Sequence, residues 1–124
     1  MNQKHILVVE DELLHVEIYK TTLTEAGFSV GVAKDEEEVY AALKEKKPDL
    51  ILLDILLPGK SGLEILADLR GNAEYVNTPV IMLTNYDDTQ SRSKAAELDA
   101  KEYFVKANIT PTEIIRRITE LLGI

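Results

Sequence analysis

The sequence predicts one α/β domain whose parallel sheet is covered by helices on both faces. Short apolar runs rich in β-branched residues alternate with longer amphipathic segments, and this alternation occurs five times along the 124 residues. The length is close to the commonest size of one domain, and a hydrophobic fraction of 45% is sufficient for a substantial core. We therefore expect residues 1–124 to form a single domain with right-handed crossovers between strands.

Five apolar runs mark the expected strands. Residues 6–9 and 50–53 are continuous stretches of Val, Ile and Leu, as in strands that are buried on both faces of a parallel sheet. Residues 79–83 and 103–105 form two further runs, and residues 28–32 form a weaker fifth. Each run is followed by a helical pattern, which favours parallel rather than hairpin connections.

Capping residues mark the ends of the expected helices. The first helix follows Asp11 and ends at Gly27, a residue type that is common just past a helix C-terminus. The second covers about residues 35–46 and is stopped by Pro48. The remaining helices are expected to begin at Ser61 with Glu64, at Asp87 or Asp88, and at Thr110 with Pro111 and Glu113, and the third and fourth to end near Gly71 and Leu98.

Composition excludes several classes of function. Lys and Arg number 14 against 22 Asp and Glu, and the net charge of -8 would repel a phosphate backbone, so this domain alone is not expected to bind nucleic acid. The absence of cysteine removes disulfides, thiolate zinc sites and thiol nucleophiles. The N-terminal segment is too short for a signal peptide, and no apolar run approaches the roughly 20 residues of a membrane span. We expect a cytoplasmic protein without membrane contact.

Polar residues follow four of the expected strands. Glu10 and Asp11 follow the first, Asp54 the third, Thr84 the fourth and Lys106 the fifth. In an open parallel sheet the carboxyl ends of the strands meet at one edge, where ligands bind. Three carboxylates brought together there would repel one another unless a cation lay among them, and oxygen ligands favour Mg²⁺.

The same residues are the parts that phosphoryl transfer needs. The Asp54 carboxylate can attack phosphorus in line, while Mg²⁺ and the Lys106 ammonium neutralise charge on the equatorial oxygens. The Thr84 hydroxyl can hydrogen-bond one of these oxygens. Phosphorylation would replace a single negative charge with about two, and a nearby hydroxyl would be attracted to the added oxygens. An aromatic side chain with two stable positions could convert this local change into a change of the protein surface.

The whole chain resembles the receiver domain of two-component response regulators. The resemblance is carried by ILVVEDE at residues 6–12, DLILLDILLPGKSG at residues 49–62, VIMLT at residues 80–84 and EYFVK at residues 102–106. It implies a flavodoxin-like, doubly wound α/β fold with five parallel strands in the order 2-1-3-4-5 and five helices. It also implies Mg²⁺-dependent transfer from a phosphohistidine of a sensor histidine kinase or histidine phosphotransfer protein.

The resemblance assigns roles by position. Asp54 is the expected phosphoacceptor, and Lys106 is the expected phosphate-contacting lysine. Thr84 and Tyr103 match the switch pair, through which phosphorylation would change a face formed by the fourth helix, fifth strand and fifth helix. A downstream protein, or a second copy of the chain after phosphorylation, is expected at this face. The expected metal ligands are Asp11 directly, Glu10 through water, Asp54, and the backbone carbonyl of Leu56.

Ala107 and Asn85 depart from the family pattern, and Leu56 and Tyr86 occupy the two positions that in the family tune the lifetime of the phosphoryl group. Ala107 stands where a proline usually follows the lysine, and we expect a trans Lys106–Ala107 bond because a cis bond before a non-proline residue costs about 3–4 kcal/mol. Asn85 replaces a small residue and could narrow access to the acceptor. Leu56 and Tyr86 place an apolar and a bulky side chain where water would attack, so we expect a relatively long-lived phosphorylated state.

His5 and His15 are expected to be structural or surface residues away from the pocket. The acidic residues 35–38 are expected to form a charged first helical turn, favoured by the helix dipole, rather than a second metal site.

Other functions are less consistent with these patterns, and we expect a signalling switch rather than an enzyme. A phosphatase with an aspartyl-phosphate intermediate typically carries Asp-x-Asp after the first strand, where this chain has Glu10-Asp11. An FMN carrier needs a phosphate loop rich in Gly, Ser and Thr at the same place. A further alternative is the excised receiver of a longer DNA-binding regulator or hybrid kinase. We favour a stand-alone regulator or one that acts by docking to a partner.

Overall fold

Five strands form one parallel sheet in the order β2-β1-β3-β4-β5. The computed structural model describes residues 3–124. Its strands are β1 (His5–Val9), β2 (Ser29–Ala33), β3 (Leu50–Leu53), β4 (Val80–Thr84) and β5 (Glu102–Val105). The observed order confirms the predicted doubly wound α/β fold, with β1 and β3 at the centre of the sheet.

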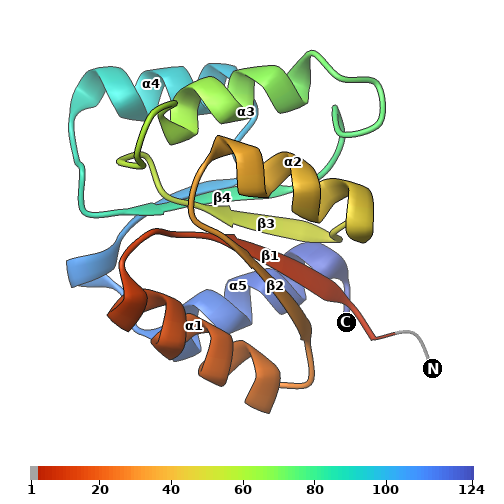
Figure 1. The fold of residues 1–124 in the computed structure, drawn as a ribbon. Helices are drawn as coiled ribbons and strands as arrows, with labels where there is room; N and C mark the ends of the chain where they lie inside the picture. The colour runs from red at the N-terminus through yellow and green to blue at the C-terminus, as the bar shows by residue number, and fades with distance from the viewer. Residues whose placement is uncertain (1–2) are drawn as a thin grey trace.

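Helices cover both faces of this sheet, as Figure 1 shows. On one face lie α1 (Leu13–Glu25) and α5 (Pro111–Leu122), and on the other lie α2 (Glu36–Glu45), α3 (Gly62–Arg70) and α4 (Thr89–Glu97). A 3-10 helix, η1 (Lys106–Asn108), follows β5 and was not predicted from the sequence. None of the helices within residues 3–124 is both long and apolar enough to cross a membrane.

The two faces of the sheet have separate apolar cores. Successive residues of a strand point to opposite faces, so β1 contributes Leu7 and Val9 to one core and Ile6 and Val8 to the other. The first core is completed mainly by buried residues of α2 and α3, and the second by buried residues of α1 and α5. All five residues of β1 are buried, as expected for a central strand with both faces covered.

Side chains cap the N-termini of four helices, and the caps of α3, α4 and α5 were predicted from the sequence. The Asp35 carboxylate accepts a hydrogen bond from the Glu38 N–H at 2.9 Å, and Asp88, rather than Asp87, accepts from the Ser91 N–H at 2.6 Å. Capping boxes open α3 at Ser61 and α5 at Thr110. The exception is α1, which begins two residues after Asp11 without a side-chain cap.

The direction of the strands determines where the polar strand ends gather. In Figure 1, β1 runs from the N-terminus at the right to the start of α1 at the left. Because all five strands are parallel, their carboxyl ends lie along the same edge of the sheet. The first turn of α1, the loops after β3 and β4, and η1 meet at this edge.

Candidate functional site

Asp54 lies at the carboxyl end of β3, in the middle of the sheet edge. Its backbone N–H donates to the carbonyl of Val9 at 3.1 Å, which extends the pairing of β1 and β3 by one residue. One carboxylate oxygen, Oδ1, accepts from the N–H of Ile55 at 2.7 Å. The residue is only 6% exposed. The backbone therefore fixes one oxygen of this carboxylate at the edge of the sheet and leaves Oδ2 for other partners.

Lys106 is the partner of that second oxygen. Its Nζ donates to Asp54 Oδ2 at 2.9 Å and also to Oε1 of Glu10, so one ammonium bridges the ends of β1 and β3. Burial favours the neutral amine and acts to lower the pKa of Lys106, but hydrogen bonds to the Glu10 and Asp54 carboxylates outweigh it and raise the pKa above its ordinary value. The lysine therefore stays charged beside the Asp54 carboxylate.

Carboxylates that follow two strands form a cluster whose oxygen atoms could bind a metal ion. Glu10, Asp11 and Asp54 each offer an oxygen within 4.8 Å of the others. Glu10 and Asp54 are buried, whereas Asp11 is exposed and open to solvent. Oε2 of Glu10 accepts from the Glu12 N–H at 3.0 Å, which orients the side chain toward the pocket. A set of hard oxygen donors with water access on one side fits Mg²⁺ better than a softer ion.

Thr84 and Tyr103 contact the same loop between β4 and α4. Thr84 is fully buried at the end of β4, and its Oγ1 accepts from the N–H of Tyr86 at 3.1 Å. The hydroxyl of Tyr103, on β5, donates to the carbonyl of Tyr86. Arg92 of α4 lies over the Tyr103 ring, with Cζ 4.7 Å from the ring centroid. One residue, Tyr86, thus connects the buried hydroxyl to the aromatic ring.

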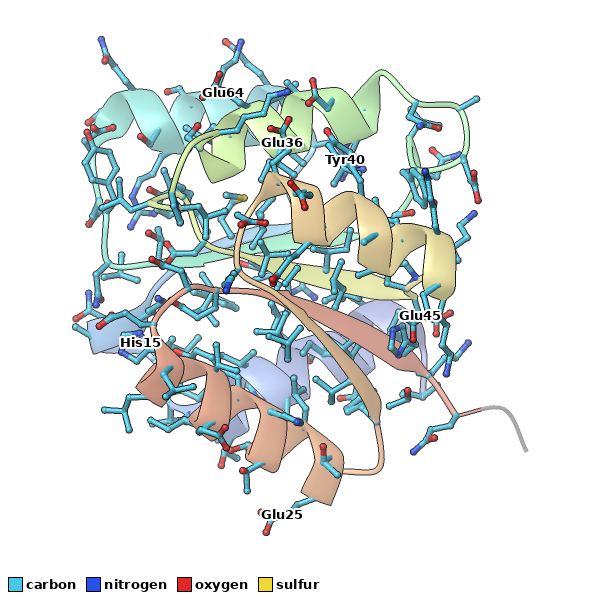
Figure 2. The ribbon with its side chains drawn as sticks, in the orientation of Figure 1. His15, Glu25, Glu36, Tyr40, Glu45 and Glu64 are labelled. Atoms are coloured by element: carbon cyan, nitrogen blue, oxygen red, sulfur yellow. The ribbon has the colours of Figure 1, made fainter. Side chains whose placement is uncertain are left out.

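Surface ion pairs hold the loop that follows Asp54. Lys60 Nζ lies 3.0 Å from Oε2 of Glu36 on α2 and also contacts Oδ2 of Asp68 on α3. The Tyr40 hydroxyl donates to the same Asp68 oxygen at 2.7 Å. Figure 2 shows Glu36 and Tyr40 on the side of α2 that faces α3. These contacts bind the loop that carries Leu56 to both neighbouring helices, although the Leu56 side chain itself is 59% exposed.

His15 lies in the pocket, so the expectation that it lies away from the pocket is wrong. Its Nδ1 is 3.2 Å from Lys106 Nζ, 3.1 Å from Oε2 of Glu12 and 3.8 Å from Oε1 of Glu10. Figure 2 shows the residue at the start of α1. Helix rotation explains the difference, since α1 begins two residues after the acid pair and turns its third residue toward the end of β5. The sequence signal that could have placed His15 here is its position in the first turn of the helix that follows the acid pair.

His5 behaves as a structural residue, as expected. It is buried at the start of β1, at the amino ends of the strands and so opposite the pocket, with Nδ1 2.8 Å from the Ser29 hydroxyl. Its backbone N–H donates to Oδ2 of Asp49 at 2.7 Å. Burial and the nearby Lys46 ammonium lower the pKa of His5, so the neutral imidazole is favoured.

The loop after Lys106 follows the trans prediction. No cis peptide bond occurs between residues 3 and 124, so Lys106–Ala107 is trans. The Ala107 N–H, which a proline would lack, donates to Oδ1 of Asn85 at 3.1 Å. Asn85 therefore ties the β4 end to η1, a contact that the sequence did not predict. Tyr86 is 41% exposed.

Comparisons with known proteins give a family match over most of the chain. The family model of the response regulator receiver domain matches residues 6–119. The phosphate regulon transcriptional regulatory protein PhoB of Pseudomonas aeruginosa is 34% identical over 96% of this chain, and the alkaline phosphatase synthesis transcriptional regulatory protein PhoP of Bacillus subtilis is 36% identical over 98%. The chain spans about half the length of these relatives, 52% and 49% respectively.

A solved structure extends the comparison to three dimensions. A CheY-like response regulator receiver domain protein from Methanospirillum hungatei superimposes with a TM-score of 0.91 at 26% identity, covering 98% of this chain and 95% of that one. The match of sequence and fold spans every element that contributes to the pocket. The chain therefore belongs to the response regulator receiver domain family.

Proposed function

We propose that this chain is a phosphoryl-accepting signalling switch whose acceptor is Asp54. The observation that carries the proposal is the Lys106 ammonium, which lies 2.9 Å from the acceptor oxygen and also contacts Glu10 of the adjacent acid cluster. A buried nucleophilic carboxylate next to a fixed cation and a group of oxygen ligands suits phosphoryl transfer, which depends mainly on position and charge neutralisation.

The donor set supports Mg²⁺ as the cofactor. Glu10, Asp11, Asp54 and the Leu56 carbonyl would hold the ion, with Asp11 as a direct ligand and Glu10 acting through water. When bound, Mg²⁺ would neutralise charge on the transferring phosphoryl oxygens. Without a cation, the carboxylate cluster would repel a phosphorylated donor, so the phosphorylation rate is expected to depend on the ion.

Each step of transfer can be assigned to residues of this chain. An Asp54 carboxylate oxygen forms a bond to phosphorus as the bond from phosphorus to the donor imidazole nitrogen breaks, and the electron pair leaves with the imidazole. Lys106 stays charged and hydrogen-bonds an equatorial oxygen. The donor is a phosphohistidine of a sensor histidine kinase or a histidine phosphotransfer protein.

Thr84 and Tyr103 provide the route from the pocket to the surface. The phosphoryl group adds acceptor oxygens beside the Thr84 hydroxyl, which gains a stronger hydrogen-bond partner than it has now. Any movement of that hydroxyl changes its bond from the Tyr86 N–H, and the Tyr86 carbonyl in turn holds the Tyr103 hydroxyl. The output face is therefore expected at α4, β5 and α5, where a downstream protein or a second copy would bind.

Beryllofluoride with Mg²⁺ tests the acceptor, because it mimics an acyl-phosphate on a carboxylate. Wild type should bind it and Asp54→Ala should not, whereas Glu25→Ala, at the far end of α1 (Figure 2), should bind like wild type. Binding by Asp54→Ala would overturn the assignment. Generic phosphomonoesters should give no multiple turnover, and sustained turnover would favour an aspartyl-phosphate phosphatase instead.

A second candidate concerns the output rather than the site. The transcriptional regulators PhoB and PhoP are about twice as long as this chain, which supports the alternative that this receiver belongs to a longer DNA-binding regulator. The two candidates differ in what the phosphorylated face contacts: a separate protein or an attached effector. Reading the coding sequence on both sides of the region for residues 1–124 would decide between them.

A further inference from the structure

Lys106 has as many hydrogen-bond acceptors as its ammonium has protons. An ammonium carries three N–H donors, and the three acceptors around Nζ are Glu10, Asp54 and His15. The first two are carboxylates of the proposed transfer site. The third, His15 Nδ1 at 3.2 Å, belongs to α1 and is not explained by the transfer chemistry described above.

Phosphoryl transfer would affect the three hydrogen-bond acceptors of Lys106 differently. If Asp54 is the acceptor and Glu10 serves the metal, both carboxylates give up part of their interaction with Lys106 to phosphorus and to a second cation. Among these three contacts, His15 is the one with no other task in the reaction. A neutral imidazole also adds no repulsion toward the incoming phosphoryl oxygens, unlike a third carboxylate.

The position of the His15 ring is restrained by its surroundings. The side chain is 24% exposed, and the ring centroid lies 6.4 Å from that of Tyr19, one turn along α1, at an interplanar angle of 44°. Tyr19 is itself buried. His15, Tyr19, Lys106 and Pro111 are among the residues that line a depression of about 250 Å³ beside the lysine. The ring is thus packed against a buried aromatic and directed toward the ammonium.

Glu12 offers the competing arrangement. Its Oε2 lies 3.1 Å from the same Nδ1 atom, so a hydrogen on Nδ1 would be donated to Glu12, and Nδ1 could not then accept from Lys106. Glu10, Glu12 and His15 also place three possible metal ligands within 4.8 Å of one another. Lys106 already contacts two of these ligands as a cation, which favours the lysine contact over a second metal site.

We propose that His15 is a positioning residue for Lys106: its Nδ1 accepts a hydrogen bond from the ammonium and keeps Nζ directed at the phosphoryl group on Asp54. The inference rests on the proposed function and deepens it, because it adds a residue of α1 to the transfer site. It requires His15 to carry its hydrogen on Nε2 in the resting protein.

Two substitutions at His15 separate the acceptor from the ring. In His15→Asn the amide oxygen occupies nearly the place of Nδ1, whereas His15→Leu fills similar space without an acceptor. Loss of one hydrogen bond should weaken beryllofluoride binding about fivefold in His15→Leu, and His15→Asn should stay close to wild type. Mg²⁺ affinity measured alone should be unchanged in both, and both variants should remain folded. Equal losses in both variants would overturn the proposal.

A double-mutant cycle with Lys106→Met tests whether the effect passes through the lysine. Without the ammonium, His15→Leu should leave the remaining beryllofluoride affinity unchanged. The same fivefold loss in the Lys106→Met background would show that His15 acts on the pocket by another path, and would overturn the positioning role.

Nitrogen-15 NMR of the resting protein gives a readout that needs no beryllofluoride. The Nε2–H tautomer, with an unprotonated Nδ1, is expected, and an Nδ1–H signal would overturn the inference in favour of the Glu12 arrangement. The outcomes also separate the two proposals. If Asp54→Ala abolishes beryllofluoride binding while His15→Leu leaves it unaffected, the proposed function stands and this inference falls. If wild type fails to bind beryllofluoride, the proposed function falls, and the tautomer of His15 still tests its contact with Lys106.

Discussion

A Cβ atom at Gly62 would lie 1.8 Å from the carbonyl oxygen of Asp54. The first residue of α3 therefore approaches the backbone of Asp54 more closely than any side chain allows. A hydrogen bond from the Gly62 N–H to the Ile55 carbonyl, at 2.8 Å, holds this approach. The geometry of Asp54 depends on a glycine eight residues away in sequence.

Gly62→Ala should destabilise the protein and distort the pocket, because the obstructing atom is backbone and cannot rotate away. We expect a loss of about 3 kcal/mol in the free energy of unfolding, as for severe overpacking, measured by urea denaturation. Gly71→Ala is the matched control, since a Cβ there would make ordinary contacts at 3.6 Å. Equal stability of Gly62→Ala and the control would contradict the close approach.

Arg70 should be a major determinant of stability although it lies outside the pocket. Its guanidinium donates to the carbonyls of Tyr75, Thr78, Leu98 and Asp99 at 2.8–3.2 Å, and so joins the loop after α3 to the loop after α4. Arg70→Met should cost about 3 kcal/mol, because several partly buried carbonyls lose their donor while the apolar stem is kept. Arg116→Met, at an exposed position of α5, should change the melting temperature little.

Stability should decrease as the pH is lowered through the range in which His5 takes up a proton. Burial, with help from Lys46, lowers the pKa of folded His5 below its ordinary value of 6.5, whereas Asp49 and Glu45 oppose the shift. The unfolded state then binds the proton first, so the stabilising contribution is complete above 6.5 and is lost as the pH falls toward the folded pKa.

The measurement is the free energy of unfolding between about pH 7.5 and 5.5, above the ordinary range of carboxylate titration. His5→Asn keeps an acceptor for the Ser29 hydroxyl but cannot be protonated, so its stability should vary less with pH than that of wild type. A wild-type profile that is flat, or that rises toward low pH, would contradict the expected direction.

Arg92 should restrain the ring of Tyr103. The guanidinium lies over the ring and is held by Oδ1 of Asp87 at 2.6 Å. An exposed cation–π contact is worth about 0.5–1 kcal/mol, so Arg92→Ala should shift the side-chain rotamer populations of Tyr103 by a few-fold, as read from three-bond NMR couplings. Arg92→Lys retains a cation, so its Tyr103 rotamer populations should lie between those of wild type and Arg92→Ala. Unchanged couplings in Arg92→Ala would show that the Tyr86 carbonyl alone orients the ring.

Leu56 and Tyr86 should slow the loss of the phosphoryl group. Both residues are exposed on loops at the carboxyl edge of the sheet, where their side chains can exclude an attacking water. Leu56→Asn places a polar group there that can orient water, and should shorten the phosphorylated lifetime several-fold in a radiolabel decay assay. Decay of the wild type within seconds would contradict the expected long lifetime.

The sequence by itself determined the elements and most of the site. Periodicity and caps depend on neighbouring residues, so the strands and the boxes at Ser61 and Thr110 could be read directly. Asp54, Thr84 and Lys106 could be proposed because parallel strands must end at one edge, whatever else the fold does. The trans bond before Ala107 also followed from local energetics alone.

Only the tertiary structure decided which side chains meet. The contact of His15 with Lys106 joins residues 91 positions apart, and the contact of Asn85 with Ala107 joins residues 22 positions apart. Such contacts depend on how far α1 is rotated about its axis and on how η1 folds back toward β4. Helix rotation and loop path are set by packing against the whole sheet, and that information is not contained in any short stretch of the chain.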